Sequence, residues 1–116
     1  AAGGALHEPH AGAVDLPAIA KAPDAHGRQA LLALPGIGPW TVDIYYLMAL
    51  RRPDVWPQGD LALAEALHRV FQLPARPRAE EQWAIATAWA PWRSVAARML
   101  WQSYLAARPS RGPAAA

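Results

Sequence analysis

Apolar residues recur at helical spacing along most of the chain. In residues 60–73, for example, Leu63, Leu67, Val70 and Phe71 repeat every three or four positions, which places them on one face of a helix. No run alternates apolar β-branched residues with polar ones, as a half-buried strand would. The pattern therefore predicts an all-α fold, a bundle of five or six short helices.

Aspartate, proline and glycine mark the ends of these helices. Asp15, Asp24 and Asp60 each precede an apolar segment, where a side-chain oxygen can cap a helix. Pro39 stands at a favoured first helical position. Breaks at residues 51–59 and 74–78 separate the expected helices, which cover about 15–22, 24–34, 39–50, 60–73, 79–89 and 92–107.

Several side chains can be assigned to a surface or to the core from this pattern. The apolar stripe expected on the helix at 39–50 consists of Trp40, Ile44, Leu47 and Met48. The tryptophans expected in packing are Trp83, Trp89 and Trp92. We expect Asp43 to face solvent and Asp54 to lie in a turn.

Both ends of the chain are rich in small residues and lack helical periodicity. We therefore expect a flexible segment at 1–14, one domain at 15–108 and a C-terminal tail at 109–116. The chain begins with Ala rather than Met, which indicates a fragment or a processed product.

Composition and charge narrow the classes of partner. The 116 residues include no cysteine, which excludes disulfides, cysteine–zinc sites and cysteine-held iron–sulfur clusters. No apolar run reaches the ~20 residues of a membrane span, and no signal-peptide pattern opens the chain. Residues 51–116 hold nine arginines against five acidic residues. This mildly basic half permits a polyanionic partner.

The most informative segment is LPGIGPWT, at residues 34–41. A helix ends before it and another begins within it, and Gly36 and Gly38 permit a tight turn between them. Bare backbone amides at the start of the second helix can hold one anion, and a DNA phosphate would fit there without any base being recognised. A plain helical corner, with glycines for geometry alone, is the alternative. Ile37 would pack between the two helices as a hydrophobic contact.

Together with three other segments, this string resembles a known family. Those segments are RPDVWPQGDLAL at 52–63, APWRS at 90–94 and Trp101. They are similar to the 3-methyladenine DNA glycosylase II group of the helix-hairpin-helix (HhH-GPD) DNA glycosylase superfamily. The resemblance covers roughly residues 28–105 and implies a helix-hairpin-helix glycosylase-like bundle that is partial relative to the family.

The resemblance implies a role for several residues. It places the catalytic aspartate at Asp60 and the aromatic walls of the base pocket at Trp40 and Trp101. It places contacts to a DNA phosphate at Gly36, Gly38 and Thr41. It also places a monovalent cation, Na⁺ or K⁺, on the backbone carbonyls of Leu32, Leu34 and Ile37.

Asp60 also has a simpler interpretation as the N-cap of the next helix. The two roles can coexist, because a helix N-terminus favours an ionised carboxylate, and an anion stabilises the positive charge that builds on a sugar when a glycosidic bond breaks. Family members that also cut the strand carry a lysine at the hairpin-end position that Trp40 occupies. Lys21 is the only lysine in this chain, so we expect base excision without strand cleavage.

The preferred hypothesis is a DNA glycosylase that flips out alkylated purines and hydrolyses their N-glycosidic bond. The alternatives are a truncated DNA-binding module that excises nothing and a helical interaction domain. We expect a monomer acting on double-stranded DNA with alkylated bases, without a membrane or a required cofactor, and located in the cytoplasm at the nucleoid if the source is prokaryotic. Four arginines could neutralise phosphates or simply be solvated: Arg51, Arg52, Arg93 and Arg98.

Overall fold

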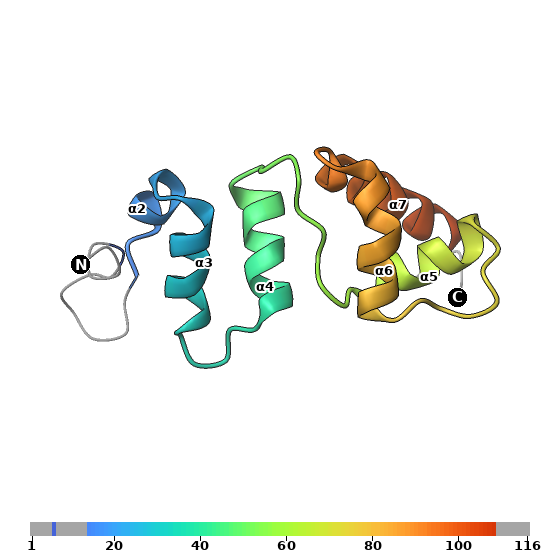
Figure 1. Cartoon of the computed structure of the whole chain (residues 1–116), viewed down its shortest axis with the longest axis horizontal. Helices are drawn as coiled ribbons and strands as arrows, with labels where there is room; N and C mark the ends of the chain where they lie inside the picture. The colour runs from blue at the N-terminus through green and yellow to red at the C-terminus, as the bar shows by residue number, and fades with distance from the viewer. Residues whose placement is uncertain (1–5, 7–13, 109–116) are drawn as a thin grey trace, which may run out of the picture. The chain divides into compact units, whose positions relative to one another are not determined.

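The computed structural model describes residues 6 and 14–108 of the chain, and these residues are helical without any strand (Figure 1). The expected all-α fold is therefore confirmed. A π-helix, η1, continues α4, and a 3₁₀-helix, η2, continues α6. The elements are α2 (Leu16–Lys21), α3 (Asp24–Leu32), α4 (Pro39–Ile44), η1 (Tyr45–Ala49), α5 (Leu61–Val70), α6 (Ala79–Ala86), η2 (Thr87–Trp89) and α7 (Arg93–Ala107).

The chain forms two compact units that divide after Arg51. The first unit contains α2, α3, α4 and η1, and the second contains α5, α6, η2 and α7. The expected flexible segment at 1–14 and tail at 109–116 lie outside the described residues, apart from Leu6 and Val14.

In the first unit, α3 and α4 lie side by side and are joined by the turn at residues 33–38 (Figure 1). Their core includes Ile19, Val42 and Tyr46, each almost completely buried. A Cβ at Gly27 would overlap the hydroxyl of Tyr46, so a glycine on α3 is what allows this close approach. The Tyr46 hydroxyl in turn donates to the backbone carbonyl of Asp24 at 3.4 Å.

Two predicted caps differ in outcome. Asp15 caps α2, because its side chain accepts from the Ala18 amide at 3.1 Å. Asp24 is instead the first residue of α3, and Pro23 occupies the N-cap position. The reason is that the Pro23 carbonyl already accepts the first backbone hydrogen bonds of the helix, from His26 and Gly27. Asp24 still lies in the first turn, where a negative charge is favourable.

The helix expected at 39–50 changes character after Ile44, where five residues form the π-helix η1. The predicted apolar stripe was wrong in part, since Trp40 is 46% exposed and Met48 is 50% exposed. The buried face instead consists of Val42, Asp43, Tyr46 and Leu47. Asp43 was expected in solvent but is 7% exposed, because it pairs with Arg28 of α3.

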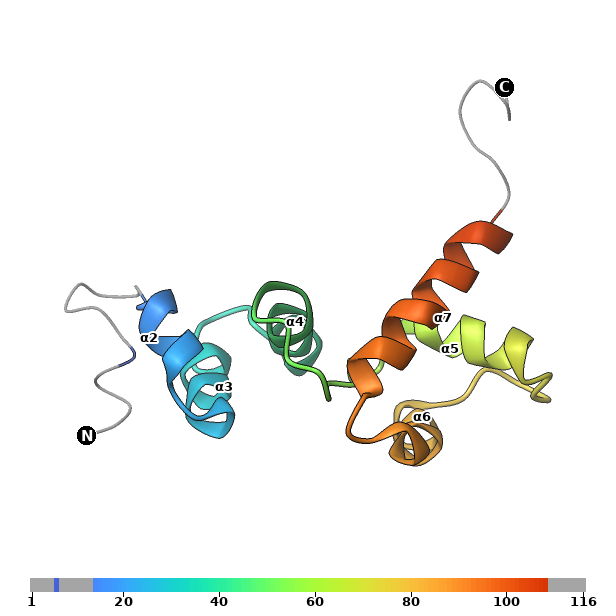
Figure 2. The ribbon, with the colours of Figure 1, turned by 90° about the horizontal axis from the view of Figure 1, so that it is seen from above.

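In the second unit α5 packs against α7 and crosses it (Figure 2), and η2 joins α6 to α7. Leu63, Leu67 and Ala97 are fully buried in this core. The loop that precedes α5 contributes three further buried residues, Val55, Trp56 and Pro57. Each of these six side chains belongs to α5, to α7 or to the loop between Arg52 and Asp60, so the core of this unit fixes where α5 begins.

The predicted core of this unit was too large. Val70 and Phe71 are about half exposed, Trp83 is 52% exposed and Trp92 is 60% exposed. Trp89 is only partly buried and stacks on Phe71 with ring centroids 6.1 Å apart. Short helices of a small unit have little interior, so large aromatic rings remain at its surface.

Candidate functional site

The hairpin has the backbone geometry that an anion site requires. Gly36 adopts a positive φ of +80°, and Gly38 is the N-cap of α4, with Pro39 as its first residue. No side chain caps α4. Within the part of the chain that the structure describes, the amides of Gly36 and Gly38 have no hydrogen-bond acceptor. Donors at a helix start with no internal partner attract an anion.

The backbone conformation requires a glycine at position 36 but not at position 38. At Gly36 the positive φ alone disfavours any other residue. Gly38 has an ordinary φ of −103°, and a Cβ there would meet no atom of the chain within 4 Å. Nothing inside the protein therefore demands a glycine at position 38, whereas a group approaching from outside would.

The carbonyls implied for a monovalent cation lie in the same turn. Leu34 accepts one hydrogen bond, from the Ile37 amide at 3.3 Å, and a carbonyl oxygen has a second lone pair. Neutral oxygen donors at Leu32, Leu34 and Ile37 are the hard ligands that Na⁺ or K⁺ accepts. The donor chemistry of the turn thus fits such a cation.

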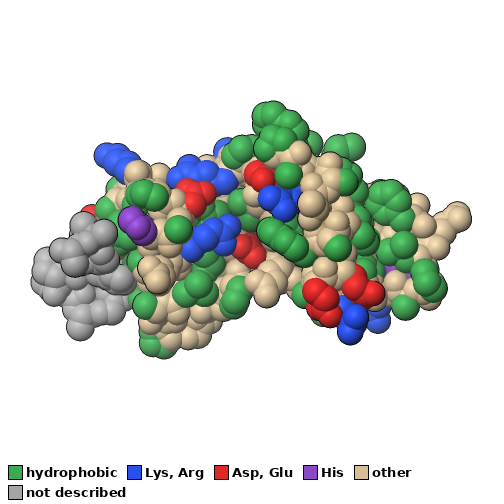
Figure 3. Space-filling view, viewed as in Figure 1, with side chains coloured by type: hydrophobic (Ala, Val, Ile, Leu, Met, Phe, Trp, Pro, Cys, Tyr) green, Lys and Arg blue, Asp and Glu red, His purple; other side chains and the backbone are tan. Residues whose placement is uncertain are grey.

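Trp40 and Thr41 follow directly in the first turn of α4. Both are exposed, Trp40 at 46%. An exposed indole beside an anion site presents a flat face to which a base could stack. On the face shown in Figure 3, acidic side chains lie beside basic ones in several places, so this face carries no broad patch of one sign. We therefore expect phosphate binding at the hairpin to depend on hydrogen bonds from backbone amides more than on a cluster of arginine side chains.

Asp60 does cap α5. Its Oδ1 accepts from the Leu63 amide at 2.8 Å and from the Trp101 indole Nε1–H at 3.3 Å. The residue is only 6% exposed, and Trp101 comes from the middle of α7. The structure thus brings together two of the residues singled out from the sequence, Asp60 and Trp101.

This environment suits a carboxylate that acts as a fixed anion. Two N–H groups on different helices aim at one oxygen, which holds the side chain in place. Low exposure also weakens solvent screening, so the charge would act strongly on a cation close to it. A helix cap and an electrostatic site are therefore compatible in the same residue.

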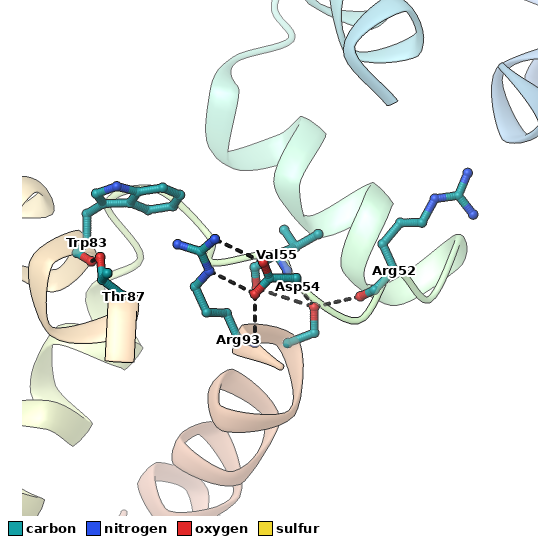
Figure 4. Close-up of polar contacts among 7 residues, drawn as sticks. Arg52, Asp54, Val55, Trp83, Thr87 and Arg93 are labelled. Atoms are coloured by element: carbon teal, nitrogen blue, oxygen red, sulfur yellow. Dashed lines mark hydrogen bonds and ion pairs between the residues drawn. The ribbon is translucent and has the colours of Figure 1, made fainter. Parts of the chain in front are cut away.

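Sequence reasoning missed a group of polar contacts close to Asp60 in the chain. Arg93 donates from Nε to Asp54 Oδ1 at 2.8 Å and from Nη2 to Oδ2 at 2.9 Å, as Figure 4 shows. The Arg93 amide also donates to Asp54 Oδ1, at 3.1 Å. These hydrogen bonds lower the pKa of Asp54. No local signal could have found the pair, because the two residues are 39 positions apart.

The second unit also has an apolar groove of about 630 Å³ between the end of α5, η2 and α7. Phe71, Trp89, Trp92 and Met99 line it, and neither Asp60 nor Trp101 does. Its edge on α5 is at the opposite end of that helix from Asp60, about 16 Å along the helix at 1.5 Å per residue. On α7 its lining includes Leu100, next to the Trp101 that donates to Asp60.

Two searches of the described residues bear on other classes of site. No group of three or more His, Asp or Glu side chains is arranged to hold a metal ion within residues 6 and 14–108. None of the helices in the same residues is long and apolar enough to cross a membrane.

Three known proteins are similar to this chain. "Putative DNA-3-methyladenine glycosylase YfjP" of Bacillus subtilis is 34% identical over 92 residues, which are 79% of this chain and 32% of that protein. "Probable bifunctional transcriptional activator/DNA repair enzyme AlkA" of Mycobacterium tuberculosis is 43% identical over 74 residues, 64% of this chain and 14% of that protein. "DNA-3-methyladenine glycosylase 1" of Schizosaccharomyces pombe is 32% identical over 75 residues, 65% of this chain and 33% of that protein.

The chain thus spans about a third or less of the length of these relatives. No protein-family model matches it, and no solved structure matches it significantly. The similarities agree with the resemblance carried by the hairpin and by the segment around Asp60. Over most of its length, the chain is therefore similar to part of proteins named as DNA-3-methyladenine glycosylases.

Proposed function

We propose that this chain works as a DNA glycosylase that removes alkylated purines of the 3-methyladenine type from double-stranded DNA. Three observations support the proposal: the names of its relatives, the uncapped hairpin amides, and the held carboxylate of Asp60. The observation that carries it is Asp60, since a carboxylate fixed by two donors is what the chemistry needs.

DNA binding begins at the hairpin in this proposal. One phosphate accepts hydrogen bonds from the amides around Gly36 and Gly38, with Thr41 beside it, while the base near that phosphate leaves the duplex. A Na⁺ or K⁺ ion on the carbonyls of Leu32, Leu34 and Ile37 would supply positive charge next to the same phosphate. The family resemblance assigns contacts with the extruded base to Trp40 and to Trp101, and a base made cationic by alkylation is attracted to an indole face.

Bond cleavage then depends on Asp60. The bond between the base nitrogen and the sugar C1′ breaks, and its electron pair leaves with the electron-poor base. Positive charge develops on the sugar, which the Asp60 carboxylate stabilises. A water oxygen bonds to C1′ and passes a proton to the Asp60 carboxylate or to bulk water, so the products are a free base and an abasic site.

Strand cleavage by a Schiff base has no candidate residue. Lys21, the only lysine of the chain, is the last residue of α2, whereas the proposed site uses Trp40 at the start of α4. The activity proposed is therefore monofunctional. We also propose that the protein acts as a monomer located at the DNA, in the nucleoid if its source is a prokaryote.

The second candidate is a helix-hairpin-helix module that binds DNA without excising a base. It uses the same hairpin residues, so DNA binding cannot separate the two candidates. Only the chemistry at Asp60 can.

The separating experiment is release of 3-methyladenine and 7-methylguanine from alkylated duplex DNA by this chain and by Asp60→Asn. Glu65→Gln is the matched control, because it removes a carboxylate from the same helix outside the site. Release by the parent and by Glu65→Gln, with loss in Asp60→Asn, supports the glycosylase. DNA binding by all three without release supports the module.

A further inference from the structure

Three consecutive residues of the loop before α5 are tied to the N-terminus of α7. The Ser94 amide donates to the Pro53 carbonyl at 3.0 Å, and the Ser94 hydroxyl accepts from the Val55 amide at 2.8 Å. Between them Asp54 receives three hydrogen bonds from Arg93, one from its amide and two from its guanidinium. We name Pro53, Asp54, Val55, Arg93 and Ser94 the loop clamp; Figure 4 labels Asp54, Val55 and Arg93 among them.

The guanidinium of Arg93 is held on a second side as well. It lies over the ring of Trp83 on α6, 4.6 Å from the ring centroid, and Figure 4 shows that ring beside it. The Arg93 side chain is only 16% exposed. Arg93 is therefore engaged within the protein, which argues against the phosphate contact considered for it from the sequence.

The clamp and the carboxylate site share one helix. Trp101, which donates to Asp60, lies eight residues along α7 from Arg93, about 12 Å at 1.5 Å per residue. The chain runs from Asp54 to Asp60 through Val55, Trp56 and Pro57, which are all buried. α7 thus fixes this short segment at its start, through Arg93 and Ser94, and at its end, through Trp101.

We propose that Arg93 and Asp54 are positioning residues that set the place of the Asp60 carboxylate against Trp101. The inference rests on the proposed role of Asp60 and deepens it. A shift of about 1 Å in a catalytic group can lower a rate about 10²-fold, so a residue that fixes the loop can govern the reaction without touching the substrate. A fully exposed ion pair contributes little stability, but this pair is bidentate, partly buried and supported by a backbone hydrogen bond.

The first readout is the Trp101 indole N–H signal in a ¹H–¹⁵N spectrum of the whole 116-residue chain, without DNA. The chain has six tryptophans, and Trp101→Phe assigns the signal. Asp60→Asn shows how the Trp101 signal moves when the hydrogen-bond acceptor at position 60 is changed. Asp54→Asn and Arg93→Lys are expected to move it, because each breaks the bidentate pair.

Glu81→Gln is the matched control for this experiment. Glu81 also accepts from an arginine, since Arg78 donates to it from its backbone amide at 2.8 Å and from Nε at 3.3 Å. That pair is exposed and lies at the start of α6. The control should leave the Trp101 signal in place. Should Asp54→Asn fail to fold, Arg93→Lys decides the matter alone.

The second readout is steady-state base release under the conditions used for Asp60→Asn. Asp54→Asn should lower kcat about tenfold or more while KM changes less than about twofold, and Arg93→Lys should keep part of the rate. An unmoved Trp101 signal together with parental kcat in both variants would overturn the inference. If the parent releases no base, the proposed function fails, and the Trp101 signal still decides whether the clamp positions Asp60.

Discussion

Each unit of this chain begins a helix close after a glycine, but Gly38 directly precedes α4, whereas Asp60 stands between Gly59 and α5. α4 starts after Gly38 with no side-chain cap. α5 starts after Gly59 and is capped by Asp60. Every helix N-terminus carries partial positive charge, so the first can receive an external anion while the second already holds an internal one. The same local structure thus provides the proposed phosphate site in one unit and holds the proposed catalytic carboxylate in the other.

Each unit also contains an arginine–aspartate ion pair that links segments far apart in the sequence. In the first unit Arg28 of α3 pairs with Asp43 of α4, which joins the two helices of the hairpin. In the second, Arg93 of α7 pairs with Asp54 of the loop before Asp60. Both pairs are more buried than a typical surface ion pair, so solvent screens them less.

The largest expected effect tests whether the anion at the start of α5 does more than cap the helix. Asp60→Asn should lower base release about 10²–10³-fold, yet barely change the unfolding temperature, because asparagine caps as well as aspartate. Asp60→Ala should lose the same activity and about 1 kcal/mol of stability as well. Equal activity in the parent and Asp60→Asn would mean that Asp60 serves only as the N-cap of α5.

The second prediction concerns the pair that joins the two hairpin helices. Asp43→Ala removes a buried partner of Arg28 and should lower the free energy of unfolding by about 2 kcal/mol. Glu80→Ala, which removes an exposed carboxylate beside Arg78, should change it by less than about 0.5 kcal/mol. Urea unfolding followed by circular dichroism measures both, and similar values would mean that burial of Asp43 adds nothing.

The third prediction separates the two glycines at the start of α4. Gly38→Ala should fold as the parent does, since its Cβ has open space, but should weaken duplex binding about tenfold by blocking a phosphate. Gly36→Ala should instead cost about 1 kcal/mol of stability through its positive φ. Fluorescence anisotropy with duplex DNA and thermal unfolding give the two values. Unchanged DNA binding by Gly38→Ala would show that no phosphate binds at Gly38.

The smallest effect is the pH dependence of the loop clamp. Hydrogen bonds from Arg93 lower the pKa of Asp54 from its ordinary 3.8. A carboxyl group with a lowered folded-state pKa stabilises the fold fully above its unfolded pKa, and this contribution disappears as pH falls through the folded value. Stability should therefore drop by about 1 kcal/mol below about pH 4.

Asp54→Asn should remove that part of the acid sensitivity. Arg78 also lowers the pKa of Glu81, which adds a loss of stability in the same direction. Glu81→Gln measures that second contribution separately. Identical unfolding curves for the parent and Asp54→Asn between pH 2.5 and 6 would show that the clamp carries no such linkage.

Which helices form was largely predictable from the sequence. The caps at Asp15 and Asp60, the turn at Gly36 and the breaks around residues 51–59 depend on neighbours within four positions. Those rules act in any chain that contains the same residues. The hairpin motif and the cap at Asp60 were recognisable for this reason.

The surroundings of these residues were decided by the tertiary structure alone. Asp43 is buried because Arg28 lies opposite it, and Trp101 reaches Asp60 from 41 positions away. Arg93 pairs with Asp54 across 39 positions. Hydrophobic periodicity identifies the buried face of a helix only when that face is apolar. A buried charged residue such as Asp43 cannot be predicted in this way, because its burial depends on an oppositely charged partner elsewhere in the fold. Only the packing of α5 on α7, and of α3 on α4, supplies those partners.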